Sequence, residues 1–225
     1  MGNDIVDLRD PSNQPDAIHP RFDARAFTAT ELRELRGSAS PHRRRWTLWA
    51  AKESAYKAAK KLDPTVRFFP REFVVEGLSE GLNEGLNEGL GEGLGEGLGE
   101  EGAEVHHSAG RFIVRLRHCD EWVHAVATPR SRLGRRRSVI TRSPWPGSAG
   151  VRSIERARGN PSEVVRDLAM DSIASGMAVA RKDVELEARG RIPEVRMRDA
   201  RLRVDLSLSH DGQYVAWAWA GAVRC

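Results

Sequence analysis

Cysteine is almost absent from this chain of 225 residues. Its two cysteines, Cys119 and Cys225, lie far apart in the sequence, which excludes a framework of disulfide bonds as the basis of the fold. The sequence also lacks an apolar run of the roughly 20 residues that a membrane helix requires, and no basic start leads into an apolar segment. These absences predict a soluble protein of the reducing cytoplasm.

Positive and negative charges are distributed unevenly along the chain. The formal net charge is +4, but the segment 76–102 carries eight glutamates and neither lysine nor arginine. The rest of the chain therefore has a net charge of +12, which favours anionic partners. Nucleic acid, a phosphorylated ligand and an acidic protein all fit this description, and charge alone does not choose among them.

The segment 76–102 is a run of tandem Glu-Gly-Leu-x units. Glycine in every unit makes an ordered conformation costly in entropy, and it disfavours a stable helix. The composition therefore predicts an exposed, disordered insertion.

Outside this insertion, the sequence looks like one unit written twice. A capping residue followed by proline, as at a helix start, occurs at 40–41 and again at 160–161, an offset of 120. Two apolar, strand-like stretches, 122–127 and 214–219, have an offset of 92. The difference between the two offsets is 28, and the insertion of 27 residues nearly accounts for it.

The predicted fold class is α+β, with two pseudo-symmetric halves that each pack a helix on a small antiparallel sheet. The first half spans 1–128 and contains the insertion, 129–159 is a linker, and the second half spans 160–225. The predicted helices span 41–62 and 161–181, and the predicted strand regions span 68–75, 111–128, 184–187 and 203–220. A ligand cleft is expected between the two halves.

The predicted helix at 41–62 has two unlike faces. Its apolar stripe consists of Leu48, Ala51, Ala55, Ala59 and Leu62. The opposite face carries Glu53 and Lys57 together with Trp46, and Trp49 lies at its margin. A Glu–Lys pair four residues apart is common on solvated helices, where it contributes about 0.3 to 0.5 kcal/mol, so spacing alone favours that ordinary interpretation. No alignment of the second half reproduces this pair, so the repeated fold does not require it.

Two further segments contain side chains that bind metals or phosphates. Asp4 and Asp7 belong to an apolar N-terminal strand, and carboxylate oxygens are ligands that magnesium prefers. Ordinary capping acids of an edge strand would give the same pattern. Ser207, Ser209 and His210 lie where another strand enters a turn, and a histidine in that position is by itself unremarkable.

Three segments together resemble the signature of the 4'-phosphopantetheinyl transferase superfamily: GNDIVD at 2–7, WAAKESAYK at 49–57 and SLSH at 207–210. The resemblance spans nearly the whole chain, and the Lys-Glu-Ser-x-x-Lys core of the second segment is its specific part. It implies transfer of the 4'-phosphopantetheine group of coenzyme A to a serine of an acyl or peptidyl carrier protein, with release of 3',5'-ADP. The motif order is similar to that of the holo-acyl-carrier-protein synthase branch, in which the site forms between identical subunits. Two fused halves are instead similar to the longer branch, so monomer and homo-oligomer both stay open.

The resemblance also implies a role for each matching residue of the first half. Asp4 and Glu53 would hold magnesium against the coenzyme A pyrophosphate. Glu53 would accept the proton of the carrier serine, and Lys57 would stabilise the departing 3',5'-ADP.

Contacts to coenzyme A are expected from both halves. His210, with Ser207 and Ser209 beside it, would contact the coenzyme phosphates. Arg45, in the arginine run 43–45, would meet the adenosine 3'-phosphate, although such a run is more often merely solvated.

Basic residues near the N-terminus are candidates for docking the carrier, because carrier proteins are acidic. Arg21, Arg25 and Arg33 flank two aromatic residues, Phe22 and Phe27, in a segment that resembles the docking region of the family.

Two other functions stay open. A protein of the same fold could bind coenzyme A or the carrier without catalysis, which the intact Asp4, Glu53 and Lys57 argue against. A basic nucleic-acid-binding protein would explain the charge, but the sequence has no recognisable reading motif. The sequence also leaves open whether the carrier serves fatty-acid, polyketide or nonribosomal peptide biosynthesis.

Overall fold

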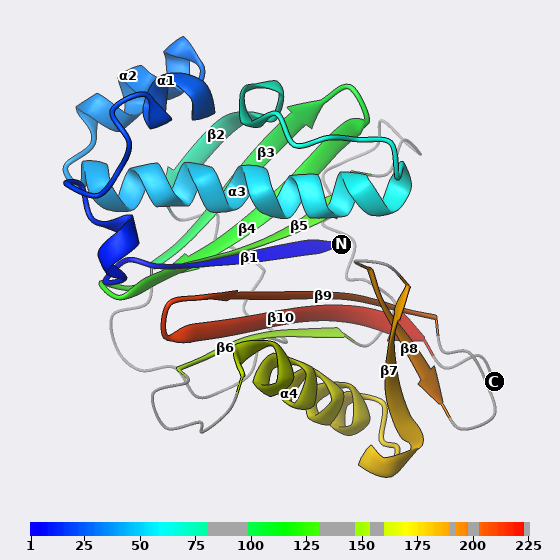
Figure 1. Ribbon diagram of the computed structural model, residues 1–225. Coiled ribbons are helices and arrows are strands. Elements are labelled where there is room, and N and C mark those ends of the chain that lie inside the picture. Colours follow the sequence, from blue (N-terminus) through cyan, green and yellow to red (C-terminus); the bar gives the residue numbers. More distant parts are fainter. Residues whose placement is uncertain (81–98, 131–146, 154–159, 190–191, 198–202, 223–225) are drawn as a thin grey trace.

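The computed structural model describes residues 1–80, 99–130, 147–153, 160–189, 192–197 and 203–222, and its architecture is mixed α+β with antiparallel sheets (Figure 1). The helices are α1 Phe22–Ala26, α2 Ala29–Gly37, α3 Pro41–Leu62 and α4 Pro161–Gly176, with the 3-10 helices η1 Pro11–Asn13, η2 Pro70–Glu72 and η3 Arg181–Asp183. The strands are β1 Gly2–Asp7, β2 Val74–Glu80, β3 Gly99–His107, β4 Gly110–His118, β5 Trp122–Pro129, β6 Gly147–Ser153, β7 Val184–Arg189, β8 Ile192–Met197, β9 Arg203–Asp211 and β10 Tyr214–Ala222. Among the described residues, no helix is both long and apolar enough to cross a membrane.

The first half is a five-stranded antiparallel sheet with α3 lying across one face (Figure 1). Its strand order is β1-β5-β4-β3-β2. Strand β4 illustrates why the sheet has one covered face, since Phe112, Val114 and Leu116 are buried in the core while Arg115 between them is exposed. The predicted helix at 41–62 is confirmed, because α3 begins and ends at those residues.

The apolar face of α3 consists of small side chains, so the sheet can approach the helix closely. Leu48, Ala51, Ala55 and Ala59 have no exposed surface. The prediction was wrong for Leu62, which is 57 % exposed. The helix ends at Leu62, so the sheet no longer covers its side chain.

Strand β1 lies very close to α3 at Gly2. A Cβ atom on Gly2 would lie 2.1 Å from the Ser54 carbonyl oxygen and 2.6 Å from the Ala58 nitrogen. These distances are far below van der Waals contact, so a larger residue would push the strand away from the helix. Gly2 therefore fixes the height at which Asp4, two residues along the same strand face, stands against α3.

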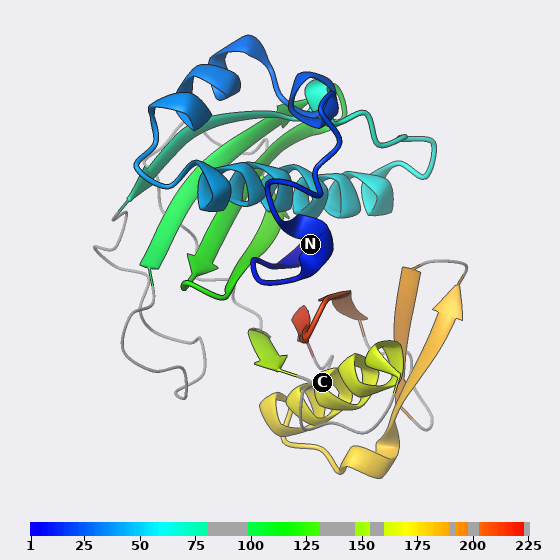
Figure 2. The same ribbon diagram turned by 60° about the vertical axis from the view of Figure 1, so that its left-hand side comes forward.

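The second half packs α4 on a three-stranded antiparallel sheet of order β6-β10-β9, with the hairpin β7–β8 beside it (Figure 2). Its core contains Ile173 of α4 together with Leu206, Val215 and Trp219 of the sheet. Helix α4 ends at Gly176, five residues before the predicted end. That the two halves arose from one repeated unit stays a prediction, since one sheet has five strands and the other three.

Both ends of the Glu-Gly-Leu segment are paired strands, so the predicted disordered insertion was wrong for them. Residues 76–80 extend β2 and residues 99–102 extend β3, while 81–98 lie outside the described residues. Pairing between strands, such as Glu80 with Glu101, gives the backbone N–H and C=O groups partners even though the segment is rich in glycine. Glu101 is also buried, where it contacts His118 over 3.0 Å and Arg44 over 3.2 Å.

Part of the predicted linker 129–159 is also a strand. Residues 147–153 form β6, which pairs along β10, while 131–146 and 154–159 lie outside the described residues. Small residues suit this position, because a Cβ on Gly150 would lie 2.4 Å from Cζ2 of Trp217. A stretch rich in glycine and serine suggests a linker by composition, but here it makes room for a tryptophan of the neighbouring strand.

The halves meet where the edge strands β1 and β9 run side by side (Figure 1). Buried apolar residues fill the joint behind them, namely Ile5, Trp122, Val151 and Ala216. At one end, Lys61 Nζ lies 2.7 Å from Asp205 Oδ1 and also donates to the Leu206 carbonyl. The joint therefore combines an apolar core with polar contacts from α3 and β9.

Candidate functional site

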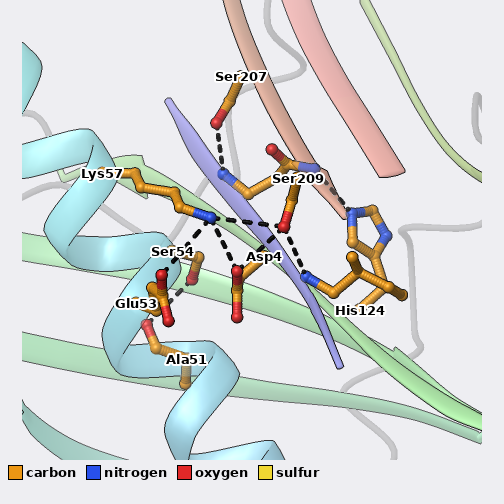
Figure 3. Close-up of polar contacts among 10 residues, drawn as sticks. Asp4, Ala51, Glu53, Ser54, Lys57, His124, Ser207 and Ser209 are labelled. Atoms are coloured by element: carbon orange, nitrogen blue, oxygen red, sulfur yellow. Dashed lines mark hydrogen bonds and ion pairs between the residues drawn. The ribbon is translucent and has the colours of Figure 1, made fainter. Parts of the chain in front are cut away.

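A polar cavity of about 330 Å³ lies at the joint of the two halves. Strand β1, helix α3 and strand β9 all contribute to its wall (Figure 3). The lining residues are Asp4, Ile5, Val6, Asn13, Trp46, Trp49, Glu53, Lys57, Leu208, Ser209, His210 and Asp211. Five residues predicted from the sequence are therefore brought together in its wall, namely Asp4, Glu53, Lys57, Ser209 and His210.

Lys57 lies between the two predicted metal ligands. Its Nζ is 2.8 Å from Asp4 Oδ1 and 3.8 Å from Glu53 Oε1 (Figure 3). The spacing of four residues places Glu53 and Lys57 on one face of α3, as the sequence predicted. The side chain of Asp4 is 7 % exposed, whereas those of Glu53 and Lys57 are 29 % and 27 % exposed, so the two α3 residues face the open side of the cavity.

The electrostatics of the cavity change the protonation of Glu53. Burial, and next the negative charge of Asp4, raise the pKa of Glu53 to about 7, although Lys57 opposes this shift. Burial lowers the pKa of Lys57, but the carboxylates of Asp4 and Glu53 outweigh it, so the net shift is upward and Lys57 stays charged. The cavity thus contains a permanent cation beside a carboxyl group that titrates near neutral pH.

Ser207 and Ser209 bind the backbone of the opposite half. The Asn3 N–H donates to Ser207 Oγ over 2.9 Å, and the Ile5 N–H donates to Ser209 Oγ over 3.2 Å. Asp211 continues the series, because its Oδ2 accepts from the Asp7 N–H over 2.8 Å. Side chains at every second position of β9 therefore accept hydrogen bonds from backbone N–H groups along the outer edge of β1.

Ser209 also contacts the charged groups of the cavity. Its Oγ lies 3.1 Å from Asp4 Oδ1 and 3.4 Å from Lys57 Nζ (Figure 3). Ser207 lies outside the cavity wall and is 4 % exposed. The sequence placed both serines beside coenzyme phosphates, whereas the structure gives both of them partners within the protein.

His210 lines the cavity from β9 and is exposed, whereas Glu53 and Lys57 line it from α3. Its Nε2 lies 3.3 Å from the hydroxyl of Ser162, which is in the first turn of α4. The imidazole is therefore within reach of a ligand that enters between the halves.

Arg45 lies outside the cavity. Its guanidinium forms a bidentate ion pair with Asp23 of α1, with distances of 2.7 Å and 3.0 Å. The neighbouring Arg44 contacts Glu101 instead. The arginine run 43–45 therefore has partners in the fold, and the predicted contact of Arg45 with a cofactor would require it to release Asp23.

The sequence analysis missed two polar residues of the cavity wall, Asn13 and Asp211. Asn13 Nδ2 donates to the Asp7 carbonyl over 2.9 Å and to Asp211 Oδ2 over 2.7 Å, while its own carbonyl accepts from Trp46 Nε1 over 3.1 Å. Burial raises the pKa of Asp211. For Asn13 no sequence signal existed, but Asp211 follows Ser207 and Ser209 at the same spacing of two residues.

Lys52, the first lysine of the Lys-Glu-Ser-x-x-Lys segment, is outside the site and inside the core. It has no exposed surface, and its Nζ lies 2.8 Å from Glu31 Oε1. It also donates to the carbonyl oxygens of Pro70 and Phe73. Lys52 therefore ties α3 to α2 and to the chain that enters β2.

The donor set of the cavity fits a hard divalent cation. Asp4 and Glu53 supply carboxylate oxygens, and the polar contacts of Asp4 to Lys57 and Ser209 both involve Oδ1. Within the described residues, no three side chains of the ligating types converge on one point. Magnesium suits such a site, because it is often held by one or two carboxylates together with water and substrate phosphates.

Residues 1–77 match the family model of the 4'-phosphopantetheinyl transferase superfamily. The matched residues include Asp4, Glu53 and Lys57, so the resemblance to this superfamily of transferases is confirmed for this part of the chain. The segment 207–210 lies beyond the match. No curated protein and no solved structure is significantly similar to the chain.

Proposed function

We propose that this protein transfers the 4'-phosphopantetheine group of coenzyme A to a serine of a carrier protein, with magnesium, and releases 3',5'-ADP. One observation carries the proposal: Asp4, Glu53 and Lys57 line the same cavity as His210 of the opposite half. The family match supports the transferase class, and it contains three of these four residues. The motif order further supports the holo-acyl-carrier-protein synthase type.

Asp4 and Glu53 would hold magnesium, which when bound would neutralise charge on the pyrophosphate oxygens. His210 would contact the phosphates of coenzyme A from the opposite wall. The ammonium group of Lys57 is held by the carboxylates of Asp4 and Glu53. It would therefore stay beside the pyrophosphate throughout the reaction. Positioned charges of this kind supply most of the stabilisation in phosphoryl-type transfer.

The transfer step exchanges one phosphorus–oxygen bond for another. The serine oxygen of the carrier bonds to the phosphorus attached to the pantetheine arm, and the bond from that phosphorus to the bridging oxygen breaks. The serine proton moves to Glu53, which acts as the general base. The electron pair of the broken bond leaves with 3',5'-ADP, and Lys57 offsets its charge.

Ser209 and Ser207 have positioning roles in this proposal. Ser209 holds Asp4, and both serines hold β1 against β9. A direct phosphate contact is therefore assigned to His210 alone among the residues of the SLSH segment.

One chain supplies both walls of the cavity, so we propose that a single chain is sufficient for activity. Residues of β1 and α3 come from the first half, and His210 comes from β9. An assembly of several chains would not be needed to complete the site.

The test is the intact mass of an apo acyl carrier protein after incubation with this protein, coenzyme A and magnesium. A gain of one phosphopantetheine group is expected, and it should be lost with EDTA and in the Glu53→Gln variant. Glu163→Gln, an exposed glutamate of α4, is the matched control and should keep activity. No gain with apo carriers from fatty-acid, polyketide and peptide synthesis would favour a binding protein without catalysis.

A further inference from the structure

The segment between α3 and β2 presents an aromatic side chain to solvent beside an aromatic cluster. Phe69 is 54 % exposed, and it and Leu62 are the large hydrophobic side chains that stand out most from the described surface. Phe68 points the other way, with ring centroids 4.8 Å from Tyr56 and 5.5 Å from Trp49. Pro70 favours an extended backbone at Phe69, so neighbouring side chains alternate between the cluster and solvent.

Arginines flank Phe69 on both sides. Arg67 and Arg71 are exposed, and neither forms an ion pair with another described residue. Helix α1 contacts η2 and adds the exposed Arg21 and Arg25 to the same region. The surface around Phe69 is therefore apolar at its centre and basic at its rim.

The acidic residues near this surface do not cancel its charge. Asp23 of α1 is held by Arg45, whereas the side chain of Glu72 in η2 is 63 % exposed. Asp63 lies at the start of the segment, just after α3. The exposed arginines Arg21, Arg25, Arg67 and Arg71 outnumber the exposed carboxylates Asp63 and Glu72, so the surface keeps a net positive charge.

This surface borders the cavity through one tryptophan. Trp49 lines the cavity, and its ring contacts both Phe68 and Phe22 of α1. A protein bound over Phe69 would therefore lie beside the opening that contains Glu53.

The structure also changes the docking region expected from the sequence. Phe27 is 1 % exposed, and Phe22 is half-buried against Trp46 and Trp49, so α1 offers arginines but no free aromatic side chain. Phe69 offers the apolar contact that α1 lacks.

We propose that Phe69, with Arg67 and Arg71, is the docking contact for an acidic carrier protein that presents an apolar side chain beside its modified serine. The proposal rests on the proposed function. Interfaces obtain most of their binding energy from a few aromatic and arginine side chains, and charge complementarity sets the rate and register of docking. A carrier held here would have its serine close to Glu53.

The experiment measures steady-state transfer by the full chain with a negatively charged apo acyl carrier protein, coenzyme A and magnesium. Phe69→Ala is expected to raise KM for the carrier about tenfold, with kcat and KM for coenzyme A within about twofold of wild type. A combined Arg67→Glu and Arg71→Glu variant should raise the same KM and weaken its dependence on salt. Leu62→Ala and Arg166→Glu are the controls, since Leu62 is equally exposed and Arg166 is exposed on α4.

Binding of the same apo carrier without coenzyme A, followed by fluorescence anisotropy, separates this proposal from the proposed function. Normal transfer and binding by Phe69→Ala, or equal losses in the two controls, would overturn the docking surface and leave the function standing. Binding that depends on Phe69, without any transfer by wild type, would support the surface and overturn the function. A carrier that neither binds nor reacts would overturn both.

Discussion

Ser209 donates a hydrogen bond to Asp4 over 3.1 Å, so a hydroxyl group of the second half holds a carboxylate of the first. The same oxygen accepts from the Ile5 N–H over 3.2 Å and lies 3.4 Å from Lys57 Nζ. A serine hydroxyl has one proton and two lone pairs, so these three contacts use its full capacity. The cavity therefore depends on the way the two halves are joined.

Replacement of Ser209 by alanine is expected to affect both stability and metal use. The free energy of unfolding should fall by about 1 to 3 kcal/mol, because the buried Ile5 N–H loses its acceptor. The magnesium concentration for half-maximal activity should rise, since Asp4 loses a partner that positions it. Urea unfolding and a magnesium titration measure the two effects, with Ser175→Ala, an exposed serine of α4, as control. An unchanged magnesium requirement would contradict the role assigned to Ser209.

Gly2 and Gly37 form a matched pair for testing the contact between β1 and α3. Gly2→Ala should lower the free energy of unfolding by about 1 to 3 kcal/mol and reduce transfer, because its Cβ would lie 2.1 Å from a backbone oxygen of α3 that cannot move aside. Gly37→Ala should be neutral, since a Cβ there meets nothing within 4 Å. Thermal unfolding and turnover of both variants check this, and equal effects would show that close packing at Gly2 is unimportant.

The buried Lys52–Glu31 pair predicts a large loss of stability when the charge of Lys52 is removed. Lys52→Met should destabilise the protein by about 3 to 5 kcal/mol, because it leaves the Glu31 carboxylate buried without its cation. Adding Glu31→Gln should recover part of this loss, since the remaining group is then neutral. Denaturant unfolding of both variants is the measurement, with the exposed Lys182→Met as control. A double variant less stable than Lys52→Met alone would mean that the pair is not the cause.

The raised pKa of Glu53 predicts a pH-dependent affinity for magnesium. Protons compete with the metal for Glu53 below its pKa of about 7, so the affinity should rise by up to tenfold per pH unit up to about pH 7 and then level off. The folded pKa exceeds the ordinary value of 4.5, so folding takes up a proton between these values, and the metal-free protein should lose stability as the pH rises from about 4.5 to 7. Calorimetric titration at pH 6, 7 and 8 tests the first expectation, and a flat profile would place Glu53 outside the metal site.

Local signals in the sequence predicted the elements that hold the site. The proline after a capping position and the apolar stripe located α3, and the spacing of Glu53 and Lys57 placed both on one face. The strand character of 203–220 likewise located the residues that form β9 and β10. These features depend on contacts within a helix turn or between adjacent strands, which a sequence records directly.

The features that the sequence did not reveal depend on partners far away in the chain. The glycine-rich residues 147–153 become β6 only because β10 pairs with them and Trp217 fills the space above Gly150. The hydrogen bond of Ser207 with the Asn3 N–H was likewise not foreseen, because the two residues lie 204 positions apart. Neither contact has a local sequence pattern, so composition and motif resemblance suggested other roles.

The parallel contacts of Ser207, Ser209 and Asp211 with the edge of β1 also fix the register of β9 against β1. Successive side chains of a strand point to opposite faces, so a slip of β9 by one residue would turn Leu206 and Leu208 toward β1 and leave its N–H groups without acceptors. A slipped arrangement would therefore lower the stability of the fold even in the absence of substrate. The second half thus checks its own placement during folding, because the cavity forms only in the one alignment that satisfies the backbone N–H groups of β1.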